Sequence, residues 1–182
     1  MTEATPAPAR VVDLGPSFVA FWDYWAALSK SSLVPHLRDY LDHAPPDLQP
    51  NVVLTDVSSP NEMTIRLTGT ALADVVGEMT GSHAERIYQG EARRAAIAAA
   101  WSAASLPCGY IIRRTVRSRS GMLFVSNGLV LPLLTDTAGS KTLAGYNELP
   151  QADTGFAREG QIEQVQEVDA PVWLDIGAGV PA

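Results

Sequence analysis

The stretch from Ile65 to Gly81, IRLTGTALADVVGEMTG, changes its hydrophobic period in the middle. Apolar and polar residues alternate from Ile65 to Thr68, which is the period of a β-strand. After Gly69 the apolar residues return at helical spacing, at Leu72, Val75, Val76 and Met79. The pattern predicts a strand that turns into a short helix at Gly69 and Thr70, with the threonine hydroxyl as a helix cap. A phosphate-binding loop would need a glycine-rich run that ends in Gly-Lys-Ser/Thr, so we interpret the glycine as packing geometry.

The hydrophobic periods of strands and helices also predict the positions of the other elements. Residues 51–57 and 63–69 are expected to form an antiparallel hairpin, and residues 91–106, dense in strong helix formers, a helix. Two further strands are expected at 108–118 and 122–134, and the last one is expected at residues 142–149. Helices grouped between two sets of strands indicate an α+β fold, with a five-stranded antiparallel sheet and helices on one face.

An apolar stripe predicts an N-terminal amphipathic helix that begins just after Pro16, with Ser17 as its cap. The large side chains on this stripe are Phe18, Phe21, Trp22, Trp25 and Leu28. Full burial of one such side chain contributes roughly 1.5–3 kcal/mol. Two interpretations carry equal weight: the stripe caps its own domain, or its first four side chains form the interface of a homodimer.

Composition divides the chain into a flexible N-terminal arm, an N-terminal helix with a proline-broken connector, a main domain and a C-terminal tail, with bounds 1–16, 17–50, 51–150 and 151–182. The tail is acidic and rich in glutamine, and it keeps a weak helical rhythm at Ile162, Val165 and Val168. Trp173 is expected to dock on the domain or on a partner, because an indole ring is seldom left in water.

Charge and length narrow the class of protein. The chain has 182 residues, of which 46% are hydrophobic, and this suits one folded domain. A net charge of −7 argues against nucleic-acid binding, and the basic run from Arg113 to Arg119 is interpreted as a solvated strand edge. No apolar run reaches the roughly 20 residues that span a bilayer, and no secretory pattern opens the chain. Together with the single cysteine, Cys108, these features favour a cytoplasmic protein.

Several short motifs follow the same order as the elements. They are YWAAL at 24–28, LTDV at 54–57, the stretch 65–81, LVLPLL at 129–134 and LAGY at 143–146. Over Phe21 to Pro150 this ordered set resembles the PAS domains, and in particular a bacterial group of small stand-alone or N-terminal PAS proteins with an unknown ligand. The resemblance implies a sensory or signalling module that binds a small molecule or a protein partner and acts in trans as a homodimer.

The resemblance also implies a pocket between the inner face of the sheet and the helices near Leu72–Val76 and Ala95–Trp101. The candidate ligand-binding residues are Tyr88, Trp101, Arg114, Asn127 and Tyr146. The three aromatic residues have core packing as their alternative role. Asn127 is a candidate because it interrupts the apolar face formed by Leu123, Val125, Leu129 and Leu131.

Arg114 is the candidate with the most specific chemistry. We favour the register in which it points inward with Ile112 and Val116, because the opposite register buries more charge. A buried guanidinium needs a carboxylate or phosphate partner, which either the protein or a ligand can supply. The alternative is that Arg114 lies at the edge of the sheet. Arg66 points away from the apolar residues beside it and is expected to form a structural ion pair.

The sequence argues against two familiar PAS cofactors and leaves the cofactor unknown. Flavin-binding light sensors carry Asn-Cys-Arg-Phe-Leu on a helix, whereas Cys108 stands at the start of a strand. Haem requires an axial ligand, and His83, the one histidine near the helical side, is interpreted as a surface residue. The alternative function is a small α+β barrel hydrolase or isomerase, which would show a deep pocket with an acid of shifted pKa beside a histidine.

Overall fold

The computed structural model of the chain describes residues 6–29, 32–136, 141–148 and 162–182. Its strands are β1 (Val52–Ser59), β2 (Glu62–Thr68), β3 (Gly109–Ser118), β4 (Leu123–Leu133), β5 (Lys141–Asn147), β6 (Ile162–Val168) and β7 (Val172–Leu174). Its helices are α1 (Ala9–Val12), α2 (Pro16–Ala27), α3 (Leu37–Asp42), α4 (Thr70–Val76) and α5 (Gly90–Ser105), with 3₁₀ turns η1 (Gln49–Asn51) and η2 (Ala84–Arg86).

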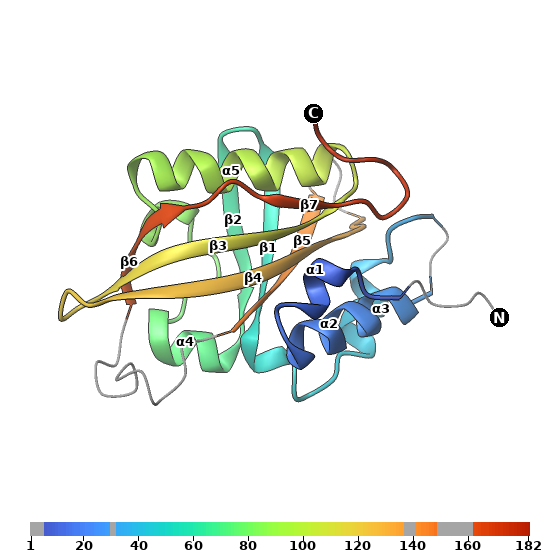
Figure 1. The fold of residues 1–182 in the computed structure, drawn as a ribbon, viewed down its shortest axis with the longest axis horizontal. Helices are drawn as coiled ribbons and strands as arrows, with labels where there is room; N and C mark the ends of the chain where they lie inside the picture. The colour runs from blue at the N-terminus through green and yellow to red at the C-terminus, as the bar shows by residue number, and fades with distance from the viewer. Residues whose placement is uncertain (1–5, 30–31, 137–140, 149–161) are drawn as a thin grey trace.

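The strands form one antiparallel sheet in the order β2-β1-β5-β4-β3-β6, and β7 also pairs with β3. The α+β class, the β1–β2 hairpin, helix α5 and the strands β3 to β5 are confirmed. The expected number of five strands is wrong, because the C-terminal segment adds β6 and β7 to the sheet. Helices also cover both faces: α1 to α3 lie on one side of the sheet and α5 lies on the other (Figure 1).

Helix α2 buries its aromatic stripe against its own sheet. Phe18, Phe21, Trp22 and Trp25 are at most 2% exposed in a single chain. The ring of Phe21 stacks on Tyr146 of β5 at 5.5 Å between centroids, and Phe18 meets the same ring edge-on at 5.2 Å. The structure therefore gives these side chains the core role, and leaves them no exposed surface for the dimer interface that was the alternative.

The described part of the N-terminal segment contains a short helix, whereas the sequence predicts a flexible arm. Residues 9–12 form α1, and Val11 is fully buried in the same core as α2. Residues 1–5 lie outside the described residues. The predicted Ser17 cap is also wrong: Gly15 is the N-cap, and Pro16 takes the first helical position, where its missing N–H costs nothing.

Gly69 marks a close approach of two backbones. A Cβ atom at this position would collide with the carbonyl oxygens of Gln49 and Pro50, and the Gly69 N–H donates to Val52 O at 2.8 Å. Gly69 is the N-cap of α4 without any side-chain cap, so the expected hydroxyl cap from Thr70 is not formed. The packing interpretation of this glycine is confirmed.

The C-terminal segment lies along the outer edge of β3, where β6 and β7 follow one another. The predicted helical rhythm of Ile162, Val165 and Val168 belongs to a strand. Two register irregularities in the β3–β6 pairing each add a residue, which lets apolar side chains three positions apart share a face. Trp173 of β7 docks on the domain, with its ring 5.6 Å from that of Tyr110.

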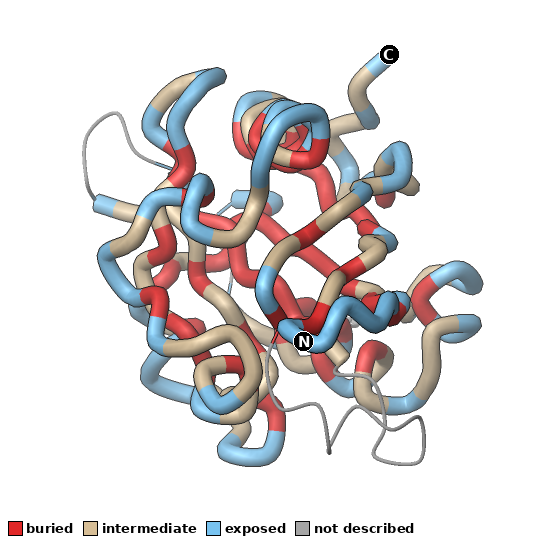
Figure 2. Tube along the Cα trace, turned by 90° about the vertical axis from the view of Figure 1, so that its left-hand side faces the viewer, coloured by how far each residue is buried: buried red, intermediate tan, exposed pale blue. Residues whose placement is uncertain are grey.

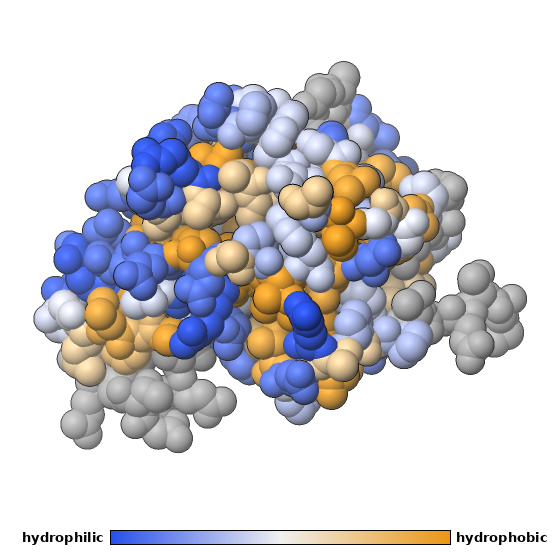
Figure 3. All heavy atoms as spheres, turned by 45° about the horizontal axis from the view of Figure 1, so that its top comes forward, coloured by the Kyte–Doolittle hydropathy of each residue, from blue (hydrophilic) through white to orange (hydrophobic). Residues whose placement is uncertain are grey.

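The buried part of the chain runs through the sheet and the inner side of α5, with exposed residues at the periphery (Figure 2). On the α5 side of the molecule, apolar residues reach the surface as separate patches among hydrophilic ones (Figure 3). Within the described ranges, no helix is long and apolar enough to cross a membrane.

Candidate functional site

A cavity of about 120 Å³ lies between the sheet and the helices α4 and α5. Leu72 and Val76 come from α4, and Ala96 and Ala100 come from α5. This is the place that the resemblance implied for a pocket. Strand β6 contributes a further part of the wall through Ile162 and Val165, which are buried. The volume of the space is close to that of an apolar cavity of about 150 Å³, which holds a benzene molecule, so the space is in the size range of a small organic molecule.

The cavity wall is mostly apolar and contains a few polar groups. The polar side chains are Thr55, Tyr88, Tyr110, Arg114, Ser126 and Asn147. Among the described residues that line the cavity, Arg114 is the one charged side chain, and none is Asp, Glu or His. Apolar walls with few placed polar groups are typical of small-molecule sites.

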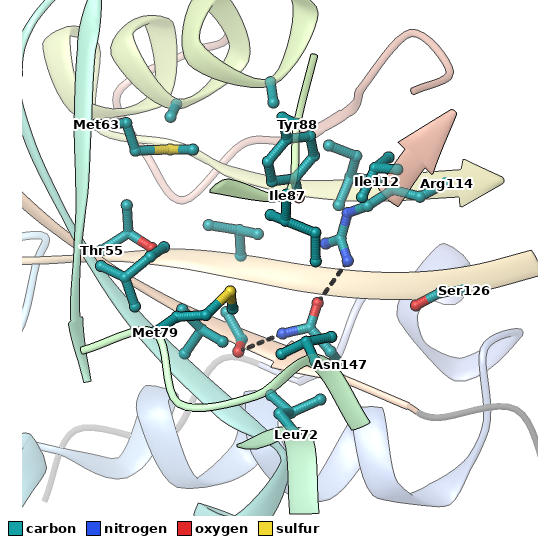
Figure 4. Close-up of a pocket in the computed structure, with 18 of the residues that line it drawn as sticks. Thr55, Met63, Leu72, Met79, Ile87, Tyr88, Ile112, Arg114, Ser126 and Asn147 are labelled. Atoms are coloured by element: carbon teal, nitrogen blue, oxygen red, sulfur yellow. Dashed lines mark hydrogen bonds between the residues drawn. The ribbon is translucent and has the colours of Figure 1, made fainter. Parts of the chain in front are cut away.

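Arg114 reaches across β4 to Asn147 on β5. Its Nη1 donates to Asn147 Oδ1 at 2.8 Å, and the Asn147 amide donates to Gly145 O at 2.9 Å (Figure 4). Strand β4 lies between these two strands, and Gly128 of β4 stands opposite Asn147 in the β-ladder. Because Gly128 has no side chain, the guanidinium lies directly over the backbone of β4.

We expect Gly128→Ala to break this arrangement. A Cβ at Gly128 would lie 2.5 Å from Arg114 Nη2 and 2.9 Å from Asn147 Oδ1. The φ of Gly128 is not positive, so the backbone itself accepts an alanine. The head group of Arg114 must move aside and give up its bond to Asn147 Oδ1. Loss of a hydrogen bond to a charged group costs about 1.5–3 kcal/mol of unfolding free energy, measurable by urea denaturation.

Gly145→Ala is the matched control for this prediction. A Cβ at Gly145 would meet its nearest neighbour, Val130 Cγ2, at an ordinary 3.6 Å. We expect the free energy of unfolding of this variant to change by less than about 1 kcal/mol. Equal losses in the two variants would contradict the role given to Gly128.

Hydroxyl groups complete the polar part of the cavity. Ser126 stands opposite Arg114 in the β3–β4 pairing. Burial raises the pKa of Tyr110 above its ordinary value, with a smaller raising effect from Tyr88 and an opposing effect from Arg114. The Tyr110 hydroxyl therefore stays protonated at neutral pH and is available as a donor.

Two of the predicted ligand-binding residues, Arg114 and Tyr88, line the cavity. Ile112 and Val116 line it as well, so the inward register of β3 is confirmed. Their role in binding a ligand stays a prediction at this point.

The other three candidates do not line the cavity. Tyr146 and Asn127 lie on the opposite face of the sheet, where Tyr146 packs on α2 and Asn127 pairs with Arg113. Trp101 of α5 is half-buried and has Lys141 Nζ 5.8 Å from the centre of its ring. Two polar lining residues that the sequence did not single out, Ser126 and Asn147, are the chain neighbours of Asn127 and Tyr146.

The remaining candidates lie outside the cavity. His83 contacts Thr64 at 3.4 Å. Cys108 is fully buried, and burial together with the Asp175 carboxylate raises its pKa to about 11, so the thiol is not a thiolate at neutral pH. The expected ion pair of Arg66 is present, with Asp56 at 2.9 Å. No cluster of potential metal ligands occurs in the described part of the chain.

The basic run on β3 is not a solvated edge. Strand β3 is an inner strand, and two of its arginines pair with acids that follow in the chain: Arg117 with Glu163 at 3.1 Å and Arg113 with Asp169 at 3.5 Å. The acidic C-terminal segment therefore offsets the charge of this run. Arg114, which points to the other face, takes part in no ion pair with a described residue.

Comparison with known proteins agrees with the order of these elements. A family model described as a PAS domain matches residues 15–147, from the start of α2 to the end of β5. A search of curated proteins finds no match to the chain. The matched range covers well over half of the sequence, including α4, α5 and most of the cavity wall. The chain therefore belongs to the PAS-domain family, whose members serve generally in sensing and signalling.

Proposed function

We propose that this protein is a sensory module that binds a small, largely apolar molecule in the cavity between the sheet, α4 and α5. The observation that carries the proposal is the cavity of about 120 Å³, whose apolar wall surrounds the linked pair Arg114 and Asn147. Apolar atoms that line a cavity gain dispersion contacts when a molecule fills it.

The wall also favours a binding module over the alternative of a small hydrolase or isomerase. General acid–base catalysis needs a carboxylate or a histidine within hydrogen-bond reach of the reacting group. The described lining residues offer hydroxyls, one amide and one guanidinium. These groups can orient a ligand, and no carboxylate or histidine stands among the described lining residues.

Filling the cavity tests the proposal. Ala100 of α5 is 1% exposed and lines the cavity, so Ala100→Leu places additional carbon atoms in the space of the ligand. For the wild-type chain, a bound molecule at a free concentration of 100 times its Kd raises the free energy of unfolding by about 2.7 kcal/mol. We expect benzoate or hexanoate to raise the thermal midpoint of the wild-type chain and to leave that of Ala100→Leu unchanged.

Ala98→Leu is the matched control, because Ala98 is an exposed residue of the same helix. This variant should respond to both compounds as the wild-type chain does. An equal response of wild type and Ala100→Leu would place binding elsewhere, and the proposal would be wrong.

The proposed output is action in trans, as a homodimer or on a signalling partner. Any dimer contact must lie away from the stripe of Phe18, Phe21, Trp22 and Trp25, because these side chains are already buried within one chain. PAS domains commonly mediate such interactions.

A further inference from the structure

We infer that the molecule bound in this cavity carries a carboxylate, which Arg114 holds, at one end of an otherwise apolar body. The inference rests on the proposed function and names the chemical class of its ligand. The reason is that the structure provides a cation inside the cavity wall and gives it only a neutral partner.

The guanidinium of Arg114 is incompletely satisfied. Asn147 Oδ1 accepts from Nη1, while the buried Nε has no hydrogen-bond partner among the described residues. A guanidinium has five N–H donors and no acceptor, and it carries a positive charge. Arg114 is half-buried, and a charge that is partly removed from water favours a paired position. No described carboxylate lies within 4 Å of Arg114.

The local structure holds this charge in place. Gly128 leaves room for the guanidinium over β4, and Asn147 is itself fixed by its bond to Gly145 O. Figure 4 shows the Arg114 head group pointing into the region between Asn147 and Ile87. An amide oxygen orients the guanidinium without neutralising it, so the charge remains available to an anion.

A carboxylate fits this position better than a phosphate. It is planar and matches the guanidinium edge with two parallel hydrogen bonds. A phosphate carries more charge into an environment where Arg114 is the one cation among the described lining residues. The rest of the wall is aliphatic and aromatic, including Leu72, Val165 and Tyr88, and this favours an apolar remainder of the ligand.

Two pairs of probes of equal size test the inference: benzoate against benzamide, and hexanoate against hexanamide. We expect the wild-type chain to bind each acid roughly ten- to hundredfold more tightly than its amide, as for hydrogen bonds to a charged group. Dissociation constants from isothermal titration calorimetry give the ratio. Arg114→Met, which keeps an apolar stem of similar length, should bring this ratio close to one, and Arg114→Lys should keep part of it.

Asn147→Asp separates charge recognition from structure. The substitution places a carboxylate where the amide now accepts from Arg114 Nη1 at 2.8 Å, and so gives the guanidinium an internal counter-ion. We expect this variant to lose the preference for acids. Because the carboxylate cannot donate to Gly145 O as the amide does at 2.9 Å, the thermal midpoint is recorded beside the dissociation constants, and the acid-to-amide ratio is the readout. If Arg114→Met fails to fold, Asn147→Asp still decides the question.

The outcomes distinguish the inference from the function on which it rests. Equal affinity of the wild-type chain for acids and amides, or tighter binding of inorganic phosphate, would overturn the inference that the ligand carries a carboxylate. Either result would leave the proposed binding function of the cavity unaffected. An acid preference that survives in Asn147→Asp would also overturn the role of Arg114. Binding of none of the probes would overturn the proposed function itself.

Discussion

A chain shortened to end at Glu148 is expected to lose its stable fold. The shortened chain lacks β6 and β7, which pair with β3 along its outer edge. Among the described residues, the buried apolar side chains that it loses are Ile162, Val165 and Leu174. At about 1.5–3 kcal/mol for each such side chain, the loss is comparable with the whole stability of a small domain, roughly 5–15 kcal/mol. Circular dichroism and limited proteolysis measure the effect.

A chain that ends at Ile176 is the control, because it loses only the last residues and keeps both strands. We expect it to unfold at nearly the same temperature as the full chain. The result has a wider meaning, because the PAS-domain match stops at residue 147 and β6 lies beyond it. A fully stable shortened chain would show that the C-terminal strands are dispensable for the fold.

Phe21→Ala is expected to lower the free energy of unfolding by about 3–5 kcal/mol. The Phe21 side chain is fully buried, and its ring stacks on Tyr146 at the centre of the face that α2 covers. Removing it leaves a void that the packed neighbours can fill only in part. Urea denaturation followed by tryptophan fluorescence measures the loss.

Asp23→Ala, an exposed residue of the same helix, should change stability by no more than about 0.5 kcal/mol. The test also separates a core from a dimer interface. Substitution of a core residue lowers the free energy of unfolding equally at every protein concentration. If the residue lies in a dimer interface, the unfolding transition depends on protein concentration. A loss for Phe21→Ala that vanishes at high protein concentration would contradict the core role.

The sequence predicts most of the fold because its strands and helices follow clear periods. Strand alternation in β1 and β2, and the alanine-rich run of α5, depend on local residues alone. The C-terminal strand β6 could not be recognised in this way. Its register irregularities bring Val165 and Ile162 to one face at a spacing of three, which imitates a helix.

The sequence identifies only some of the cavity-lining residues, and the reason again lies in strand geometry. Successive residues of a strand point to opposite faces, so an error of one position exchanges the cavity for the far side of the sheet. On β3, the cost of burying several arginines selected the right face and identified Arg114. On β4 and β5, both faces carry apolar residues, and the choice fell on Asn127 and Tyr146 in place of their neighbours Ser126 and Asn147.

Helix α2 illustrates a third limit. An aromatic stripe has the same sequence pattern whether it packs on its own sheet or on a second subunit. Only the fold shows that the ring of Tyr146 lies beneath α2, where it contacts both Phe18 and Phe21. Local sequence therefore identifies a buried face, and the topology decides what buries it.

Native mass spectrometry, followed by denaturing release, tests the central claim most directly. The protein is measured as purified and again after incubation with benzoate, beside Ala100→Leu prepared in the same way. We predict one additional small mass per wild-type chain that leaves on denaturation, and no such mass on the variant whose cavity is filled. A wild-type chain that shows its bare mass in both preparations would contradict a ligand-binding cavity.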